Sequence, residues 1–258
     1  MKTLRTLAML STVAALVACD KNAVQIDSIT APISGARVKF FNFGVNAPGV
    51  NFYAGSTKIT AISSTTGIES VNGVAYGAVG SGNLYLALPA GQVTIASKIA
   101  AATDKDLTIS TVPATLADGK AYSVYLSGFY DATAKQVEGF VVEDAFPVAF
   151  DFTQALVRFV NASPNSSPMQ LFAKNSSTAL ESPVGSVVAY KAGGAFIGLP
   201  SGSYDLNTRA AGSGVNAITR TAVSFLAGRV YTVSARGDMT IVSTTLTNRP
   251  FLDNSVNR

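Results

Sequence analysis

Four carboxylates lie close together near the middle of the chain, and acidic side chains of this kind can hydrolyse a glycosidic bond. A glycoside hydrolase uses two carboxyl groups about 5–10 Å apart, one as an acid and the other as a base or nucleophile. The second half of the chain has no matching group, and the chain has no Trp on which a sugar would stack. A carboxylate-dependent glycan hydrolase is therefore the least favoured function for the residues Asp131, Glu138, Glu143 and Asp144.

Other sets of catalytic residues are missing from the sequence. The chain has no His, which excludes Ser–His–Asp and Cys–His nucleophiles and nearly all zinc sites. The glycine-rich stretch 77–82 is not followed by the Gly-Lys-Ser/Thr of a phosphate-binding loop. Asp104-Lys105-Asp106 offers too few spaced oxygen atoms for a Ca²⁺ loop. We expect no enzyme activity, no metal site and no cofactor.

The tripeptide Arg236-Gly237-Asp238 resembles the tips that integrins bind. It lies between two predicted strands, Val230–Ala235 and Met239–Leu246, so we expect it at the tip of a hairpin. Gly and Asp are common hairpin-turn residues. A plain turn is the favoured interpretation, and a role in adhesion is the alternative.

The N-terminal residues have the layout of an export signal. Lys2 and Arg5 precede an apolar run, Leu7–Val17, that is shorter than the about 20 residues needed to span a bilayer. The run ends in a motif that resembles the lipobox of bacterial lipoproteins, in which a cysteine is acylated and becomes the first mature residue. Cys19 is the only cysteine, so no disulfide is expected. We predict a signal peptide over 1–18 and an acyl group such as palmitate on Cys19, after the lipobox residues Leu16, Val17 and Ala18.

The same segment predicts a location in the bacterial cell envelope, with the membrane as the partner of the lipid anchor. Asp20 resembles a signal for retention in the inner membrane, but the choice of membrane and leaflet stays open. Without Lys2 and Arg5 the chain has 17 basic and 15 acidic residues, and the bases of its second half are spread singly. Nucleic-acid surfaces need a basic stripe with aromatic residues, so no nucleic-acid partner is expected.

One stretch of the chain occurs twice. Residues 38–54 read VKFFNFGVNAPGVNFYA, and residues 157–173, which lie 119 positions later, read VRFVNASPNSSPMQLFA. The turn Leu88–Gly91 returns as Leu199–Gly202, and residues 118–124 return as 227–233. The order is kept while the offset shrinks, as it does when the loops of a duplicated domain diverge. The sequence therefore predicts two copies of one domain.

Each copy offers about seven short strands separated by turn residues, and neither contains an amphipathic helix. This pattern favours an all-β protein with two tandem antiparallel β-sandwich domains, immunoglobulin-like or prealbumin-like. In the first strand of the first copy both faces are largely apolar, which indicates a central strand. We expect a lipidated tether over 19–34, a first domain over 35–150 and a second over 151–258.

The repeated motifs are similar to those of DUF4397, a domain of unknown function found in bacterial envelope proteins, often in tandem. The resemblance rests on the opening strand and loop at 36–54 and 155–173 and on the two Leu-Pro-x-Gly turns. The family often has His after the first strand, where this chain has Asn42 and Asn161. A role of that His would therefore not carry over. The resemblance implies a β-sandwich and an exported location, and it implies no activity.

Loops on a rigid sheet scaffold are common binding sites, and the loop after the first strand occurs in both copies. We expect these two loops at the same end of their domains and predict them as contact loops for a protein or glycan partner. The favoured function is a non-catalytic binding module presented from a membrane, and the alternative is a structural spacer of the envelope. The contact loops are Gly44, Val45, Asn46, Ala47, Pro48 and Gly49 in the first copy and Ser163, Pro164, Asn165, Ser166, Ser167 and Pro168 in the second.

Overall fold

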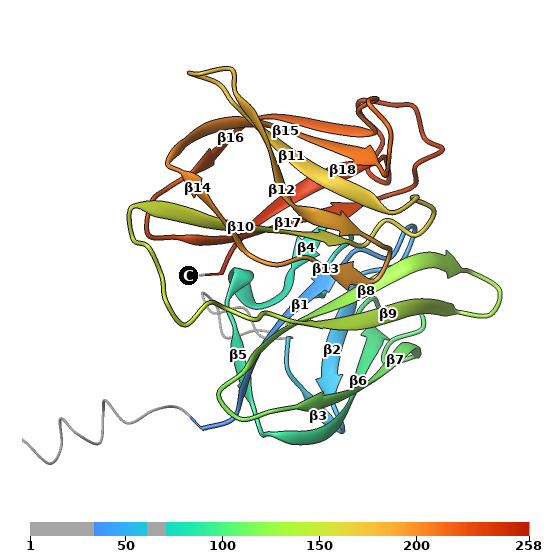
Figure 1. The fold of residues 1–258 in the computed structure, drawn as a ribbon. Helices are drawn as coiled ribbons and strands as arrows, with labels where there is room; N and C mark the ends of the chain where they lie inside the picture. The colour runs from blue at the N-terminus through green and yellow to red at the C-terminus, as the bar shows by residue number, and fades with distance from the viewer. Residues whose placement is uncertain (1–33, 61–70, 258) are drawn as a thin grey trace, which may run out of the picture. The chain divides into compact units, whose positions relative to one another are not determined.

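The computed structural model describes residues 34–60 and 71–257, and these residues are all-β (Figure 1). The only helical element among them is the short 3₁₀ segment η1 (Gly80–Asn83). Strands β1–β9 belong to the first repeat and β10–β18 to the second, and each repeat is built from two sheets. The predicted tandem β-sandwiches are therefore confirmed. The boundary expected between residues 150 and 151 falls in the connection from β9 to β10.

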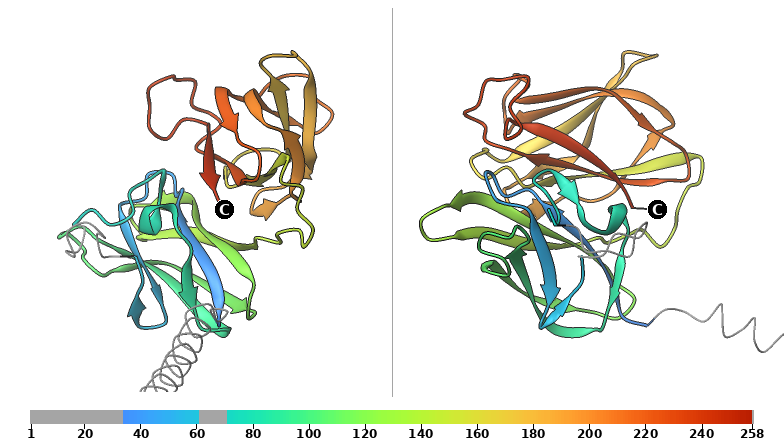
Figure 2. Two further views of the ribbon diagram at one scale, coloured as in Figure 1. Left: turned by 90° about the vertical axis from the view of Figure 1, so that its left-hand side faces the viewer. Right: turned by 180° about the vertical axis from the view of Figure 1, so that it is seen from behind.

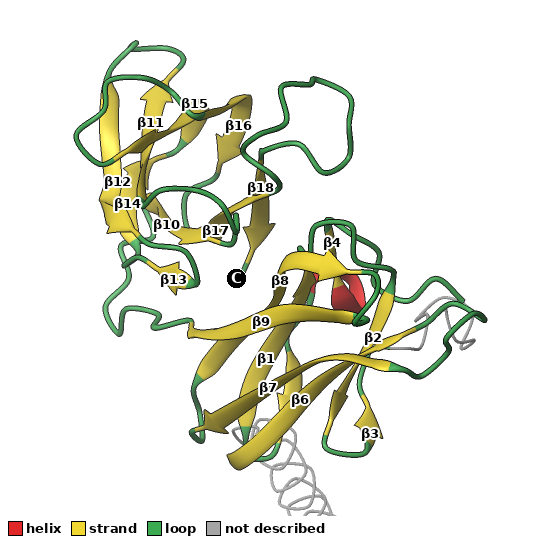
Figure 3. Cartoon of the chain, turned by 90° about the vertical axis from the view of Figure 1, so that its right-hand side faces the viewer, coloured by secondary structure: helices red, strands yellow, loops and turns green. Residues whose placement is uncertain are grey.

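The first repeat pairs its strands in two sheets that can be followed in Figure 3. The sheet that carries the first strand has the order β4-β1-β8-β9, with β5 also paired to β1. Its strands are β1 (Ala36–Asn42), β4 (Ala78–Val79), β5 (Leu86–Leu88), β8 (Ala121–Asp131) and β9 (Gln136–Glu143). The other sheet has the order β3-β2-β6-β7, with β2 (Val50–Ala54), β3 (Thr57–Lys58), β6 (Gly91–Ile99) and β7 (Thr108–Leu116).

The second repeat has the same pairing, strand for strand. Its strands, coloured from yellow to red, are seen from two further sides in Figure 2. Its first sheet has the order β13-β10-β17-β18, with β14 also paired to β10. The strands are β10 (Gln154–Asn161), β13 (Ala192–Gly193), β14 (Ile197–Pro200), β17 (Val230–Arg236) and β18 (Phe251–Val256). The other sheet has the order β12-β11-β15-β16, with β11 (Met169–Asn175), β12 (Glu181–Val188), β15 (Gly202–Ala210) and β16 (Ile218–Phe225).

One strand pair in each repeat departs from the antiparallel pattern. Strand β1 runs parallel to β8, and β10 runs parallel to β17. The chain between the two partners forms the whole opposite sheet, so it is long enough to return to the same end of the sandwich, as a parallel pair requires. All other named strand pairs are antiparallel.

The central position predicted for the first strand is confirmed, and the structure shows why both of its faces are apolar. Val38 and Phe40 point into the core of the first sandwich, where Phe40 packs on Phe52 with ring centroids 5.1 Å apart. Phe41 belongs to a separate buried cluster that includes Val160 of the second repeat. One face of β1 therefore builds the sandwich and the other face joins the repeats. In agreement with this, the chain from Gly35 onward forms one compact unit.

The strand predicted at Met239–Leu246 is wrong. Residues 239–250 contain turns and irregular backbone, and the partner of β17 is β18. The chain leaves β17 through Gly237, whose φ is +96° and whose position for a Cβ lies 2.1 Å from the carbonyl oxygen of Arg249. Only glycine fits here, because the two ends of the connection between β17 and β18 approach each other so closely. We call residues 238–250 the long loop.

Candidate functional site

A basic residue stands at the same place on the first strand of each repeat. Lys39 lies on β1 and Arg158 on β10, 119 positions apart, and their exposed fractions are 0% and 1%. Both side chains leave the sandwich core and lie between the repeats. Charged groups are rarely buried unless they are paired, so their partners decide whether this arrangement is stable.

Lys39 reaches across to the last strand of the second repeat. Its Nζ donates to the carbonyl oxygen of Val256 at 2.7 Å and to Oδ1 of Asn257 at 3.3 Å, and it lies 4.6 Å from the ring centre of Tyr85. Burial lowers the pKa of Lys39 from 10.5 to about 8, and the nearby Asp144 carboxylate partly opposes this shift.

Arg158 makes the reciprocal contact with the end of β9. Its guanidinium pairs with the buried carboxylate of Asp144 and donates to the carbonyl oxygen of Glu143 at 3.0 Å. The same carboxylate accepts hydrogen bonds from the hydroxyls of Tyr85, at 2.5 Å, and Ser123, at 2.9 Å. The backbone N–H of Asp144 donates to the carbonyl oxygen of Ala121, the first residue of β8. The backbone N–H of Asn257 donates to the carbonyl oxygen of Val230, the first residue of β17. Asp144 and Asn257 are therefore equivalent, and the two contacts are related by an approximate two-fold symmetry.

An apolar cluster fills the rest of this contact. Tyr125 stacks between Phe41, at 4.5 Å, and Phe140, at 5.0 Å, measured between ring centroids. Its hydroxyl lies 3.3 Å from Oγ of Ser234, the equivalent residue on β17. Complete burial raises the pKa of Tyr125 to about 12. The cluster consists of Phe41, Phe43, Tyr125, Phe140, Val160 and Ala162.

The four carboxylates singled out in the sequence do not form an acid–base pair. Asp144 is held by Arg158, and Glu143 lies 3.0 Å from Nζ of Lys120. Glu138 pairs with Lys191 of the second repeat at 3.0 Å, which holds its pKa below the usual range. Asp131 accepts two backbone N–H groups of its own hairpin turn. Each acid thus has a structural partner, and two of these partners belong to the other repeat.

The first predicted contact loop is mostly internal. Val45 and Ala47 are buried, and Asn46 is the one residue of the loop classed as exposed. Asn42 supports the loop, because its Nδ2 donates to the carbonyl oxygens of Pro48, at 3.0 Å, and Val74, at 2.8 Å. An Asn at this position therefore supports the loop backbone.

The second predicted contact loop is more open. Asn161 donates to Oγ of Ser166 at 2.9 Å and so supports this loop, as the equivalent Asn42 supports the first loop. The hydroxyl of Ser163 is buried and donates to the carbonyl oxygen of Gly237 at 2.7 Å. The exposed residues of the loop are Asn165, Ser167 and Pro168.

The long loop touches both predicted contact loops. Nδ2 of Asn248 donates to Oδ1 of Asn46 at 3.1 Å, which links the long loop to the first repeat. Asn165 donates to Oδ1 of Asp238 at 2.7 Å and accepts the backbone N–H of Met239 at 2.9 Å. Loops from both repeats therefore form one surface. We call this surface, formed by residues 44–49, 163–168 and 238–250, the composite loop surface.

The Arg-Gly-Asp tripeptide belongs to this surface but does not form a hairpin tip. The Arg236 guanidinium pairs with Asp253 on β18, and it lies 4.9 Å from the ring centre of Tyr76. The carboxylate of Asp238 accepts the backbone N–H of Thr240 at 2.9 Å and the Asn165 amide. Both charged side chains thus hold the loop in place, and the Arg236 side chain is half-buried.

The exposed residues of the long loop are four threonines and two large apolar side chains. Val242 is fully exposed and Leu246 is 53% exposed. An open groove of about 810 Å³ runs beside Val242, between the long loop and β16. It is lined by Ala217, Ile218, Thr219, Met239, Ile241, Val242, Ser243, Thr244, Arg249, Pro250 and Phe251.

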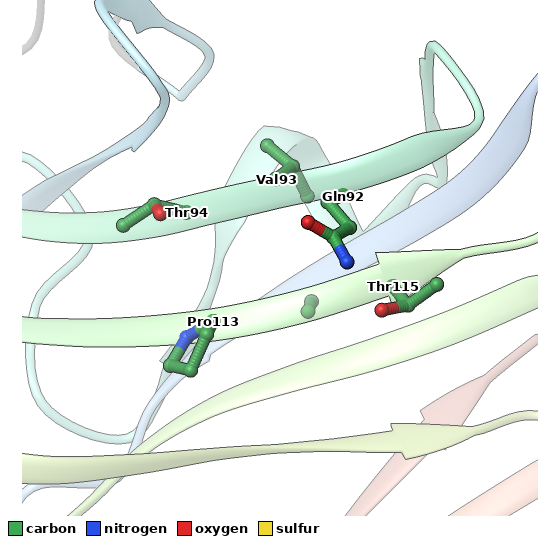
Figure 4. A pocket seen from close by; sticks show the side chains of 6 residues that line it. Gln92, Val93, Thr94, Pro113 and Thr115 are labelled. Atoms are coloured by element: carbon green, nitrogen blue, oxygen red, sulfur yellow. The ribbon is translucent and has the colours of Figure 1, made fainter.

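A second hollow, of about 500 Å³, lies over the outer face of β6 and β7 (Figure 4). Its labelled side chains are uncharged, so it offers no acid, base or metal ligand. Across residues 34–60 and 71–257 no cluster of three or more Cys, Asp or Glu side chains is placed to hold a metal ion. In the same part of the chain no helix is long and apolar enough to cross a membrane.

Sequence reasoning located the two loops but missed the residues that join the repeats. A signal was present, since Lys39 and Arg158 occupy the same position in the two repeated stretches, each between a valine and a phenylalanine. The predicted lipidation residue Cys19 and the lipobox Leu16, Val17 and Ala18 lie outside the described residues.

Comparison with known proteins adds a family. The family model of the domain of unknown function DUF4397 matches residues 36–172 and again residues 155–257. The two matches begin 119 positions apart, which is the spacing of Lys39 and Arg158. Comparison with curated proteins gave no match. Among solved structures, a candidate cell adhesion protein from Bacteroides uniformis ATCC 8492 is similar at 14% identity and a TM-score of 0.23, over 86% of this chain and 98% of that one.

Proposed function

We propose a function on the premise that this chain belongs to the DUF4397 family, whose model matches both repeats. The protein is a lipid-anchored component of the bacterial cell envelope. It has no catalytic role. Its two repeats act as one rigid body that presents the composite loop surface to a protein or glycan partner.

The observation that carries this proposal is the joining of both predicted contact loops by the long loop. Asn46 bonds to Asn248, and Asn165 bonds to Asp238, so residues from the two repeats share one surface. A binding surface gains affinity when its loops are held in place before the partner arrives. A contiguous apolar patch exposed on such a preformed surface is typical of interaction sites, and Val242 lines one groove together with Met239 and Ile241.

Rigidity between the repeats is the second support. The buried pair Arg158–Asp144 and the apolar cluster around Tyr125 both connect the two sandwiches. Interfaces between domains are often polar and permit motion. Here the contact contains stacked aromatic rings and buried charges, so the loops keep their relative positions.

Photocrosslinking in the cells that produce the protein tests the binding function. A benzophenone amino acid is placed at Val242, and the matched control carries it at Leu180, which is 71% exposed on the loop between β11 and β12. We expect a discrete cross-linked adduct from position 242 and none from position 180. Folded, membrane-bound protein that gives no adduct at position 242 would instead favour the structural spacer.

The lipid anchor is tested separately by metabolic labelling with an alkyne analogue of palmitate. The wild-type chain is expected to take up the label, and Cys19→Ala is expected to lose it, because Cys19 is the only thiol in the chain. Labelling that persists in Cys19→Ala would contradict the anchor at this position.

A further inference from the structure

We propose that the connection between the two repeats docks onto the lipid bilayer to which the chain is anchored. The docking segment is Phe146–Phe152, with the sequence FPVAFDF, and we call it the linker surface. This inference rests on the proposed anchor at Cys19 and adds a second, non-covalent contact with the same membrane.

The linker surface is apolar and strongly exposed. Val148 is fully exposed and Phe152 is 73% exposed. The Phe152 ring packs edge-on against Phe150, with ring centroids 4.7 Å apart. Single exposed apolar residues are common on proteins, but a contiguous patch of this kind marks a surface that another phase or molecule covers. A hollow of about 360 Å³ is lined by Phe146, Pro147, Val148, Phe150, Phe152, Leu156, Gly228 and Val230.

The linker surface lies beside the point where the tether joins the folded unit. The backbone N–H of Gly35 donates to the carboxylate of Asp118, and the N–H of Gly119 donates to the carbonyl oxygen of Gly35. Gly119 in turn lines a hollow of about 270 Å³ together with Arg37 and with Phe146, Pro147 and Val148. The start of the folded unit and the apolar patch therefore occupy the same end of the molecule.

Chain length then identifies the bilayer as the occupant. The 15 residues from Asp20 to Ser34 separate Cys19 from Gly35, and such a segment spans about 50 Å at most when fully extended. An anchored chain thus keeps the linker surface within reach of the bilayer, where a weak contact acts at a high effective concentration. Aromatic and aliphatic side chains of peripheral proteins lie at the boundary between head groups and acyl chains.

The charges around the linker surface predict which lipids are sufficient for its docking to the bilayer. Lys120 is 3.0 Å from Glu143, so its charge is neutralised locally. Arg37 and Asp151 add one charge of each sign. Because no net positive charge results, docking depends on apolar contact, and zwitterionic vesicles should support it.

Docking at this end directs the composite loop surface away from the membrane. Strand β1 begins next to Gly35 and ends before the loop 44–49, which bonds to the long loop through Asn46. Val242 on the long loop therefore lies at the end of the sandwich opposite the linker surface and serves as a matched exposed control.

Tryptophan fluorescence tests the docking, because the chain has no Trp of its own. Full-length lipidated Val148→Trp and Val242→Trp are added to phosphatidylcholine vesicles with brominated acyl chains. We expect at least about a twofold fluorescence loss for Val148→Trp and little for Val242→Trp, since interfacial side chains lie about 5–10 Å deep. Adding Phe152→Ser to Val148→Trp should restore much of the fluorescence. Circular dichroism confirms that each variant is folded.

Each other outcome overturns the proposal in a distinguishable way. Protein that floats with the vesicles but shows equal fluorescence for the two Trp variants has an anchor and no docked linker surface. Dimers detected by sedimentation, with no quenching, would assign the surface to a second copy of the chain. If the mass spectrum shows no acyl group on Cys19, the protein has no lipid anchor there, and both this inference and the proposed membrane attachment are wrong.

Discussion

Lys39 and Arg158 occupy equivalent places in the two repeats, and each binds the residue that follows the last strand of the other repeat. Lys39 donates to Asn257, and Arg158 pairs with Asp144. The repeats are thus joined by two related contacts that differ in charge, since one acceptor is an amide and the other a carboxylate.

Arg158→Leu is expected to destabilise the protein by about 3–5 kcal/mol, because it leaves the Asp144 carboxylate buried without its cation. Urea denaturation measures the loss. Arg158→Leu combined with Asp144→Leu should recover much of the stability, since removing both buried charges is often nearly neutral. A double variant as unstable as the sum of the two single variants would show that the pair is not coupled.

The stability of the folded protein should rise with pH above about 8. Lys39 has a pKa of about 8 when folded and 10.5 when unfolded, so the unfolded chain binds more protons between these values and stability increases with pH. The gain from pH 8 to 9.5 is up to about 2 kcal/mol, at about 1.4 kcal/mol per unit. Denaturation of wild type and Lys39→Met across this range isolates the effect, which should be absent in the variant. Parallel curves would contradict the assignment.

Phe41→Ala should cost about 3–5 kcal/mol, the usual loss when a buried phenylalanine is truncated. The ring stacks on Tyr125 in the cluster between the repeats, outside either sandwich core. Phe152→Ala is the matched control, because that ring is 73% exposed and its loss should change stability by less than about 1 kcal/mol. Similar melting temperatures for the two variants would argue against a structural role for the cluster.

Gly237→Ala should displace the long loop. The new methyl group would meet the carbonyl oxygen of Arg249, and the positive φ of this residue disfavours any side chain. We expect a lower melting temperature and faster proteolysis within 238–250. Gly214→Ala is the control, since its Cβ would find no atom within 4 Å. If both variants resist protease equally, the close approach at Gly237 is not what holds the loop.

Strand periodicity and the repeated motifs predicted the sandwiches from local information. Val38 and Phe40 alternate with Lys39 and Phe41 on one strand, so the two sets of side chains lie on its two opposite faces. The repeated motifs identified two copies of one fold, and the Gly and Pro residues between the strands located most turns. The same reasoning placed a strand at Met239–Leu246, where the apolar residues form instead an exposed loop.

Local pattern by itself determined the fold class, the duplication and the position of the repeated loops. Only the tertiary structure decided that β1 pairs in parallel with β8, that Arg158 neutralises Asp144, and that Asn46 and Asn248 share one surface. These pairs lie 14 to more than 200 positions apart, and no periodicity within a strand encodes which distant group a side chain meets. Burial of a charge depends on that partner, because a charge is stable away from water only where the fold brings its counterpart to it.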